Sequence, residues 1–173
     1  MRRILIAFLL IIPSAAWAQS GRIRVAIPDS LAATASESVD VTLDGAMLRF
    51  AARFLSDDAD REVQDMVRKL DGIYVHSYEF DRDDAYDRSI LAGVRAQLGP
   101  AWQRIVTVKS KTRENVEIYT MPNGKTIAGL VILAAEPREL TIVNIVGPVD
   151  LDKLASLEGQ FGIPRVMKGD HHE

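Results

Sequence analysis

The chain has 173 residues, and its 21 lysines and arginines against 24 aspartates and glutamates give a formal net charge of −3. This mild acidity argues against nucleic acid and against an anionic membrane surface as partners, because both attract basic surfaces. The chain contains no cysteine. Disulfides, a thiol nucleophile, thiolate metal ligands and a lipid-modified cysteine are therefore excluded.

The first 18 residues, MRRILIAFLLIIPSAAWA, have the pattern of a secretory signal peptide. Two arginines precede an apolar run, and Ala16 and Ala18 form an Ala-x-Ala cleavage motif before Gln19. The run is shorter than the roughly 20 residues that span a bilayer, and no later segment is long and apolar enough to do so. We therefore expect an exported, soluble protein, periplasmic or secreted, with 155 residues and a net charge of −5 after cleavage.

Residues 19–37 are small and polar, and we interpret them as either an ordered lead-in to the folded domain or a partly mobile arm. Alternation of polar and apolar residues predicts a strand at 39–43. Apolar spacings of three and four predict a helix over 47–55. A second helix, capped by Asp57 or Asp58, is expected to end before the Asp-Gly turn at 71–72.

The stretch GIYVHSYEFDRDD at 72–84 predicts a strand over 73–80 with two partly covered faces. The acidic residues at 81–84 are typical of the first turn of a helix, where they meet the positive end of the helix dipole. The apolar stripe of that third helix is expected to run from Tyr86 to Leu98.

Four segments in the second half are rich in Val, Ile and Thr and predict an antiparallel meander, at 104–108, 116–121, 126–135 and 140–146. Asn123-Gly124 is a strong hairpin signal between two of them. GLVILAA at 129–135 predicts a central strand covered on both faces. Pro148 is expected to end the last strand, and Asp150 to cap a closing helix.

Together these elements predict a single α+β domain over 38–164, followed by a mobile C-terminal tail at 165–173. We expect a sheet of four or more strands, mainly antiparallel, with the helices packed on one face.

His76 is the natural candidate for chemistry, but its surroundings in the sequence do not favour a site. The neighbours on its face of the strand are aromatic residues, and the chain has no Gly-x-Ser-x-Gly elbow for a serine nucleophile. We interpret it as a packed histidine, bonded to a tyrosine or to the backbone. The acidic run at 81–84 lacks the glycine and glutamate of an EF-hand loop.

Other catalytic and metal-binding patterns are equally weak, so we predict no cofactor and no metal. His171, His172 and Glu173 lie at a chain end that lacks fixed geometry. Phosphate loops, HExxH helices and GxGxxG turns are missing from the sequence. Two distant carboxylates of a hydrolase leave no signal in a sequence, and that alternative stays open.

The remaining possibility is that the protein binds a partner at an edge of its sheet. The predicted strand at 104–108 continues into a basic stretch with Lys109, Lys111 and Arg113. These cations suit either an edge that accepts a partner strand or an edge protected against one, and the sequence does not separate the two.

Five runs of the sequence resemble the bacterial family called domain of unknown function 4252: ESVDVTLDGAMLRFAARFL, LDGIYVHSYEF, WQRIVTVKS, ENVEIY and AAEPRELTIVNIVGPVDLDKLASLEGQFGIP. The resemblance covers Glu37 to Pro164 and rests on apolar and turn positions. It implies an exported bacterial protein, with no catalytic residue or cofactor to transfer. Some members are anchored by lipid, and this chain departs from them because it lacks cysteine.

We therefore expect a non-catalytic exported module that binds an envelope protein through a sheet edge or a helix surface. The alternatives are a hydrolase that uses dispersed carboxylates, and a regulatory component of the envelope stress response, which the resemblance suggests.

Overall fold

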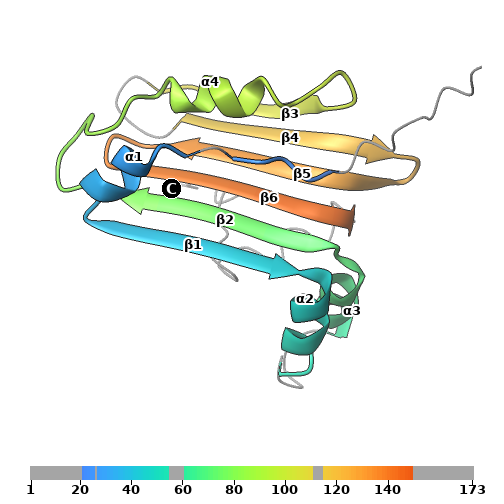
Figure 1. Ribbon diagram of the computed structural model, residues 1–173. Helices are drawn as coiled ribbons and strands as arrows, with labels where there is room; N and C mark the ends of the chain where they lie inside the picture. Colours follow the sequence, from blue (N-terminus) through green and yellow to red (C-terminus); the bar gives the residue numbers. More distant parts are fainter. Residues whose placement is uncertain (1–20, 26, 55–60, 111–114, 150–173) are drawn as a thin grey trace, which may run out of the picture.

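The computed structural model describes residues 21–25, 27–54, 61–110 and 115–149. Its centre is a six-stranded antiparallel sheet with the strand order β1-β2-β6-β5-β4-β3 (Figure 1). The strands are β1 (Glu37–Asp44), β2 (Gly72–Glu79), β3 (Gln103–Val108), β4 (Asn115–Asn123), β5 (Thr126–Ala135) and β6 (Glu139–Val149). The helices of the described residues are α1 (Asp29–Thr34), α2 (Gly45–Ala51), α3 (Arg61–Lys69) and α4 (Ile90–Arg95). The predicted α+β class is confirmed.

The second half of the chain forms the predicted meander, because β3, β4, β5 and β6 are neighbours in chain order. Gly124, in the turn between β4 and β5, has a φ of 64°, which glycine adopts without strain. β2 then pairs with β6, and β1 pairs with β2. β5 is therefore central and buried on both faces, as predicted, while β1 and β3 are the two edges.

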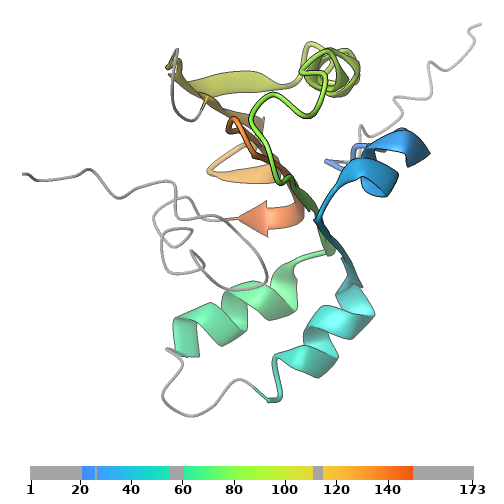
Figure 2. The same cartoon turned by 90° about the vertical axis from the view of Figure 1, so that its left-hand side faces the viewer.

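Helices cover both faces of the sheet, whereas the sequence predicted one. Side chains of β5 alternate between two cores, with Leu130 on one face and Val131 on the other. The first core contains α2 and α3, and the second contains α1, α4 and the segment before α1. Figure 2 shows α2 and α3 together, away from α1 and α4. A sheet whose central strands are apolar on both faces needs cover on both, so the second layer follows from β5 itself.

The described part of the lead-in belongs to this second layer. Ile23 and Leu31 are buried against the sheet. Asn144 on β6, only 1% exposed, holds the segment in place. Its Oδ1 accepts a hydrogen bond from the backbone N–H of Ile23 at 2.9 Å, and its Nδ2 donates to the carbonyl oxygens of Gly21 at 2.9 Å and Leu130 at 3.1 Å. Although residues 21–36 are mostly small and polar, their described part packs against the sheet.

Pro148 lies inside β6 and does not end it. The ladder between β5 and β6 shifts register here, with Gly129 opposite Val146 and Ile127 opposite Val149. Gly147 takes a φ of 122° in this irregularity. A bulge is the place where a central strand tolerates proline, because the ladder is already interrupted.

The third helix is shorter than predicted and does not begin at the acidic run. α4 spans only Ile90–Arg95. Asp84 has a φ of 53°, and its backbone N–H donates to the carbonyl oxygen of Pro137 at 2.9 Å. The acidic residues thus form a turn that is tied to the β5–β6 connection. No helix within the described ranges is long and apolar enough to cross a membrane.

Candidate functional site

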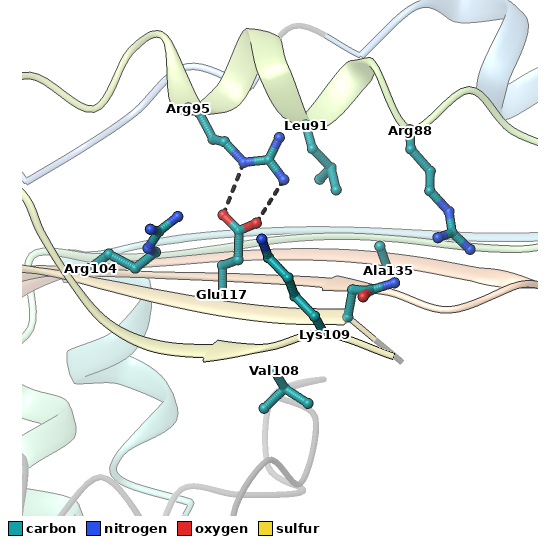
Figure 3. Close-up of a pocket in the computed structure, with 9 residues that line it drawn as sticks. Arg88, Leu91, Arg95, Arg104, Val108, Lys109, Glu117 and Ala135 are labelled. Atoms are coloured by element: carbon teal, nitrogen blue, oxygen red, sulfur yellow. Dashed lines mark hydrogen bonds and ion pairs between the residues drawn. The ribbon is translucent and has the colours of Figure 1, made fainter. Parts of the chain in front are cut away.

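A groove of about 520 Å³ lies between α4 and the strands β3 and β4. It is lined by Arg88, Leu91, Arg95, Arg104, Val108, Lys109, Asn115, Glu117 and Ala135 (Figure 3). Four of these side chains are basic and one is a carboxylate, so the lining carries a net charge of +3. We call this feature the cationic groove. Its charge is opposite to the net charge of −3 of the whole chain.

One ion pair bridges α4 and β4 within the cationic groove (Figure 3). Arg95 of α4 donates from Nε to Oε2 of Glu117 at 2.9 Å and from Nη2 to Oε1 at 2.8 Å (Figure 3). The hydroxyl of Tyr119 donates to Oε2 of the same carboxylate at 2.6 Å. These bonds tie α4 to β4 in the two-pronged geometry that suits arginine and a carboxylate.

The surroundings of Glu117 fix its protonation state. The pKa of its carboxyl is lowered, first by the hydrogen bonds from Arg95 and then by the one from Tyr119, against the opposing effect of burial. Burial and the same carboxylate raise the pKa of the Tyr119 hydroxyl. Glu117 is therefore an ionised structural acceptor, and Tyr119 is a neutral donor. Neither group is prepared to exchange a proton near neutral pH.

A bulge in β3 brings two further cations to the groove. Arg104 is paired with Tyr119, yet Val106 is paired with Ile118, so Ile105 is an extra residue in the ladder. Side chains of a strand alternate between faces, and residues five apart would ordinarily lie on opposite faces. The bulge reverses the alternation after Arg104, which places Lys109 on the same side, in the groove.

Arg104 and Lys109 are the two groove cations without a close carboxylate partner among the described residues, although Arg104 also interacts with the Tyr119 hydroxyl and, through its charge, with Glu117. Arg95 is paired with Glu117, and Arg88 lies 3.7 Å from Asp84. No ion pair joins Arg104 or Lys109 to a carboxylate within the part of the chain that the structure describes. Figure 3 shows both side chains beside the Arg95–Glu117 pair. Both are exposed and are therefore available to an anionic group that enters the groove.

The structure places only part of the predicted partner edge. β3 is an edge strand, as expected, and Lys109 follows it directly. Lys111 and Arg113 lie outside the described residues, as do the cleavage motif at Ala16, Ala18 and Gln19, the cap at Asp150 and the tail at 165–173. Sequence reasoning did not find Arg88, Arg95 or Glu117, because they reach the groove from other elements.

His76 makes a contact that differs from the one expected. Its Nδ1 lies 3.1 Å from Oδ2 of Asp40 on the neighbouring edge strand, but the two are not aligned for a hydrogen bond. Nδ1 of the histidine thus faces a carboxylate, and it has no hydrogen bond to a tyrosine or a backbone group among the described residues. Among the described residues, no group of three or more His, Asp or Glu side chains is arranged to hold a metal ion.

The exposed surface of α2 is a second feature of the described residues. Phe50 is 54% exposed and Phe54, just after the helix, is 73% exposed; their rings are edge to face, with centroids 5.0 Å apart. Apolar exposure alone does not define the chemistry of an occupant. The cationic groove does, because its charge selects an anionic one.

Comparison with known proteins identifies the family of the chain. None of the curated proteins matches the chain. The family model described as Domain of unknown function (DUF4252) matches residues 34–157, which include all six strands and α2, α3 and α4. The match covers most of the chain and agrees with the resemblance of the sequence runs. The chain belongs to the family of the domain of unknown function 4252.

Proposed function

We propose that this chain is a non-catalytic, exported binding module whose cationic groove docks an anionic part of an envelope protein. The observation that carries the proposal is the gathering of basic side chains from α4, from the turn before it and from β3 around one hollow. The signal-peptide pattern of residues 1–18 supports export, to the periplasm or beyond the cell.

The electrostatics of the groove suit recognition of an anion. A concave surface of one charge sign concentrates the field and speeds the encounter with a partner of the opposite sign. The remainder of the chain is acidic overall. The net charge of the chain therefore opposes an anionic partner while the groove attracts it, and this contrast orients the partner before contact.

The same groove is poorly suited to the rival function, a hydrolase that uses two carboxylates. Such enzymes pair an ionised carboxylate with an acid whose pKa is raised so that it can donate a proton. The lining of the groove includes one carboxylate, Glu117, and its pKa is lowered. These facts favour binding over hydrolysis at this site.

The test is site-directed photo-crosslinking in intact cells that make the full chain. A photoreactive residue replaces Thr107, which is exposed on β3 between Arg104 and Lys109. We expect a crosslinked partner in the parent chain and a loss of that product in the double variant Arg104→Gln/Lys109→Gln.

The matched control is Lys125→Gln/Arg68→Gln, which removes the same charge from two exposed positions outside the groove. It should leave the product unchanged. Equal crosslinking in all three chains, with equal thermal stability, would contradict docking through the cationic groove.

A further inference from the structure

We propose that the occupant of the cationic groove is an extended acidic segment of another protein, which adds to the free edge of β3 as a further strand. This inference rests on the proposed function and specifies its partner. It makes the backbone of β3 and the charges of the groove parts of one binding surface.

The first argument is the open edge of the sheet. β3 (Gln103–Val108) pairs with β4 on one side, and no other strand of the described residues pairs with it. Its outer backbone N–H and C=O groups can therefore form a ladder with an incoming strand. Strand addition of this kind takes its affinity from the backbone and its specificity from alternate side chains.

The second argument is the sorting of side chains on β3. Arg104 and Lys109 face the groove, whereas Val106 packs on the opposite face of the sheet. Directly opposed side chains in an antiparallel pair lie about 4.5–5.5 Å apart at Cβ. A strand added at this edge would therefore place every second side chain beside the cations, where aspartate or glutamate fits.

The third argument is apolar exposure along the same edge. Ile105 is 51% exposed and Val108 is 48% exposed. Ile105 and Val108 are next to the groove cations in the sequence. Val108 borders the groove but is paired with Val116, so its side chain points to the face on which Val106 packs (Figure 3), and an aliphatic side chain of the added strand would cover it. The two faces together select a segment in which acidic and aliphatic residues alternate.

A protected edge is the competing explanation. The bulge at Ile105 interrupts the ladder, and basic residues discourage pairing between copies of one chain. An edge that only needs protection does not require its cations to lie around one groove with Arg88 and Arg95. It also gives no reason for the two half-exposed aliphatic side chains, Ile105 and Val108, on the strand. Cations at the edge repel another basic edge but attract an acidic one, so the same residues that discourage self-pairing select this partner.

The test is a titration of the purified full chain with synthetic peptides, followed by calorimetry. The probe is a peptide of about ten residues in which Asp or Glu alternates with Val or Thr, long enough for one strand. Two further peptides carry the same side chains but have N-methyl groups on every second amide. One peptide is methylated at the odd-numbered residues and the other at the even-numbered residues. N-methylation removes the hydrogen-bond donor without changing charge.

We expect the parent peptide to bind and one of the N-methylated registers to lose affinity by at least about tenfold, because only one set of amides faces β3. The variant Arg104→Gln/Lys109→Gln should bind the parent peptide about tenfold more weakly, and Lys125→Gln/Arg68→Gln should bind it as the parent chain does.

Two results would overturn strand addition. If both N-methylated peptides bind as tightly as the parent peptide, or if inorganic phosphate competes at similar concentrations, the groove binds anions without a backbone ladder. The proposed function would then survive and this inference would fail. If no peptide binds and the crosslinking at Thr107 is also independent of the groove charges, both fail together.

Discussion

Replacement of Glu117 by glutamine should lower the stability of the fold and at the same time raise its affinity for anions. The substitution keeps the size of the side chain and removes its charge. Three hydrogen bonds to the carboxylate are weakened, two from Arg95 at 2.9 and 2.8 Å and one from Tyr119 at 2.6 Å. A hydrogen bond to a charged group contributes about 1.5–3 kcal/mol when it is well buried.

The cost at this site is smaller because the Arg95 side chain is 39% exposed. Solvent screens the pair on that side, so we expect a loss of about 1–2 kcal/mol in the free energy of unfolding, measured by urea denaturation at neutral pH. Binding should move the other way, since the lining of the groove changes from a net charge of +3 to +4. One additional unit charge about 4 Å from an anion contributes about 1 kcal/mol in water, or about fivefold in affinity for the acidic probe peptide.

The pH dependence provides an internal control. The pKa of Glu117 is lowered in the folded chain, so its contribution to stability is present above the ordinary pKa of a glutamate, about 4.3, and is lost as pH falls through the folded value. The difference in stability between the parent and Glu117→Gln should therefore shrink as the solution is acidified. Equal stability at neutral pH, or weaker binding of the acidic peptide by the variant, would refute the reasoning.

Three further substitutions test the scaffold. Asn144→Ala removes three buried hydrogen bonds, at about 1 kcal/mol each, so we expect a loss of about 3 kcal/mol in unfolding free energy and faster amide exchange at Ile23. Gly147→Ala places a Cβ 2.7 Å from the backbone nitrogen of Asp71 at a φ of 122°, and should cost at least about 2 kcal/mol by urea denaturation. Tyr86→Phe removes a hydroxyl that donates to the carbonyl oxygens of Glu136 at 2.6 Å and Glu139 at 3.0 Å, and should lower the thermal midpoint. Burial raises the pKa of Tyr86 to about 12, so in a spectroscopic titration its phenolate should form well above the ordinary pKa of a tyrosine, about 10.

The strands were largely predictable because their signals are local. Alternation, β-branched residues and the Asn-Gly turn located β1 through β6 to within a few residues, and the order of the meander followed from short connections. The position of β3 at an edge of the sheet was also predicted, because it is the first strand of the meander. The end of β6 was predicted wrongly. The strand continues past Pro148 to Val149, because the irregularity at Gly147 accommodates the proline.

The helices were less predictable because their extent depends on tertiary contacts. The stripe from Tyr86 to Leu98 is apolar at helical spacing, but Tyr86 packs on Phe80 and donates to the β5–β6 connection, which removes it from the helix. The lead-in was expected to be separate because it is polar, yet Asn144 satisfies its backbone from a distant strand.

The groove was visible in the sequence only as one basic stretch. Lys109 was singled out, but the face on which it lies depends on the bulge at Ile105, which no local pattern indicates. Arg95 and Glu117 are 22 positions apart and come together only when α4 packs over β4. A site assembled across elements in this way requires the register of the sheet before it can be recognised.

The most direct test of the groove as the binding surface is a map of backbone amide chemical shifts of the full chain during titration with the acidic probe peptide. The account predicts that the largest changes occur along β3, at Arg104 and Lys109, and extend to Arg95 on α4, and that they disappear in Arg104→Gln/Lys109→Gln. Changes centred on the exposed aromatic residues Phe50, on α2, and Phe54, just after it, with β3 unaffected, would contradict it.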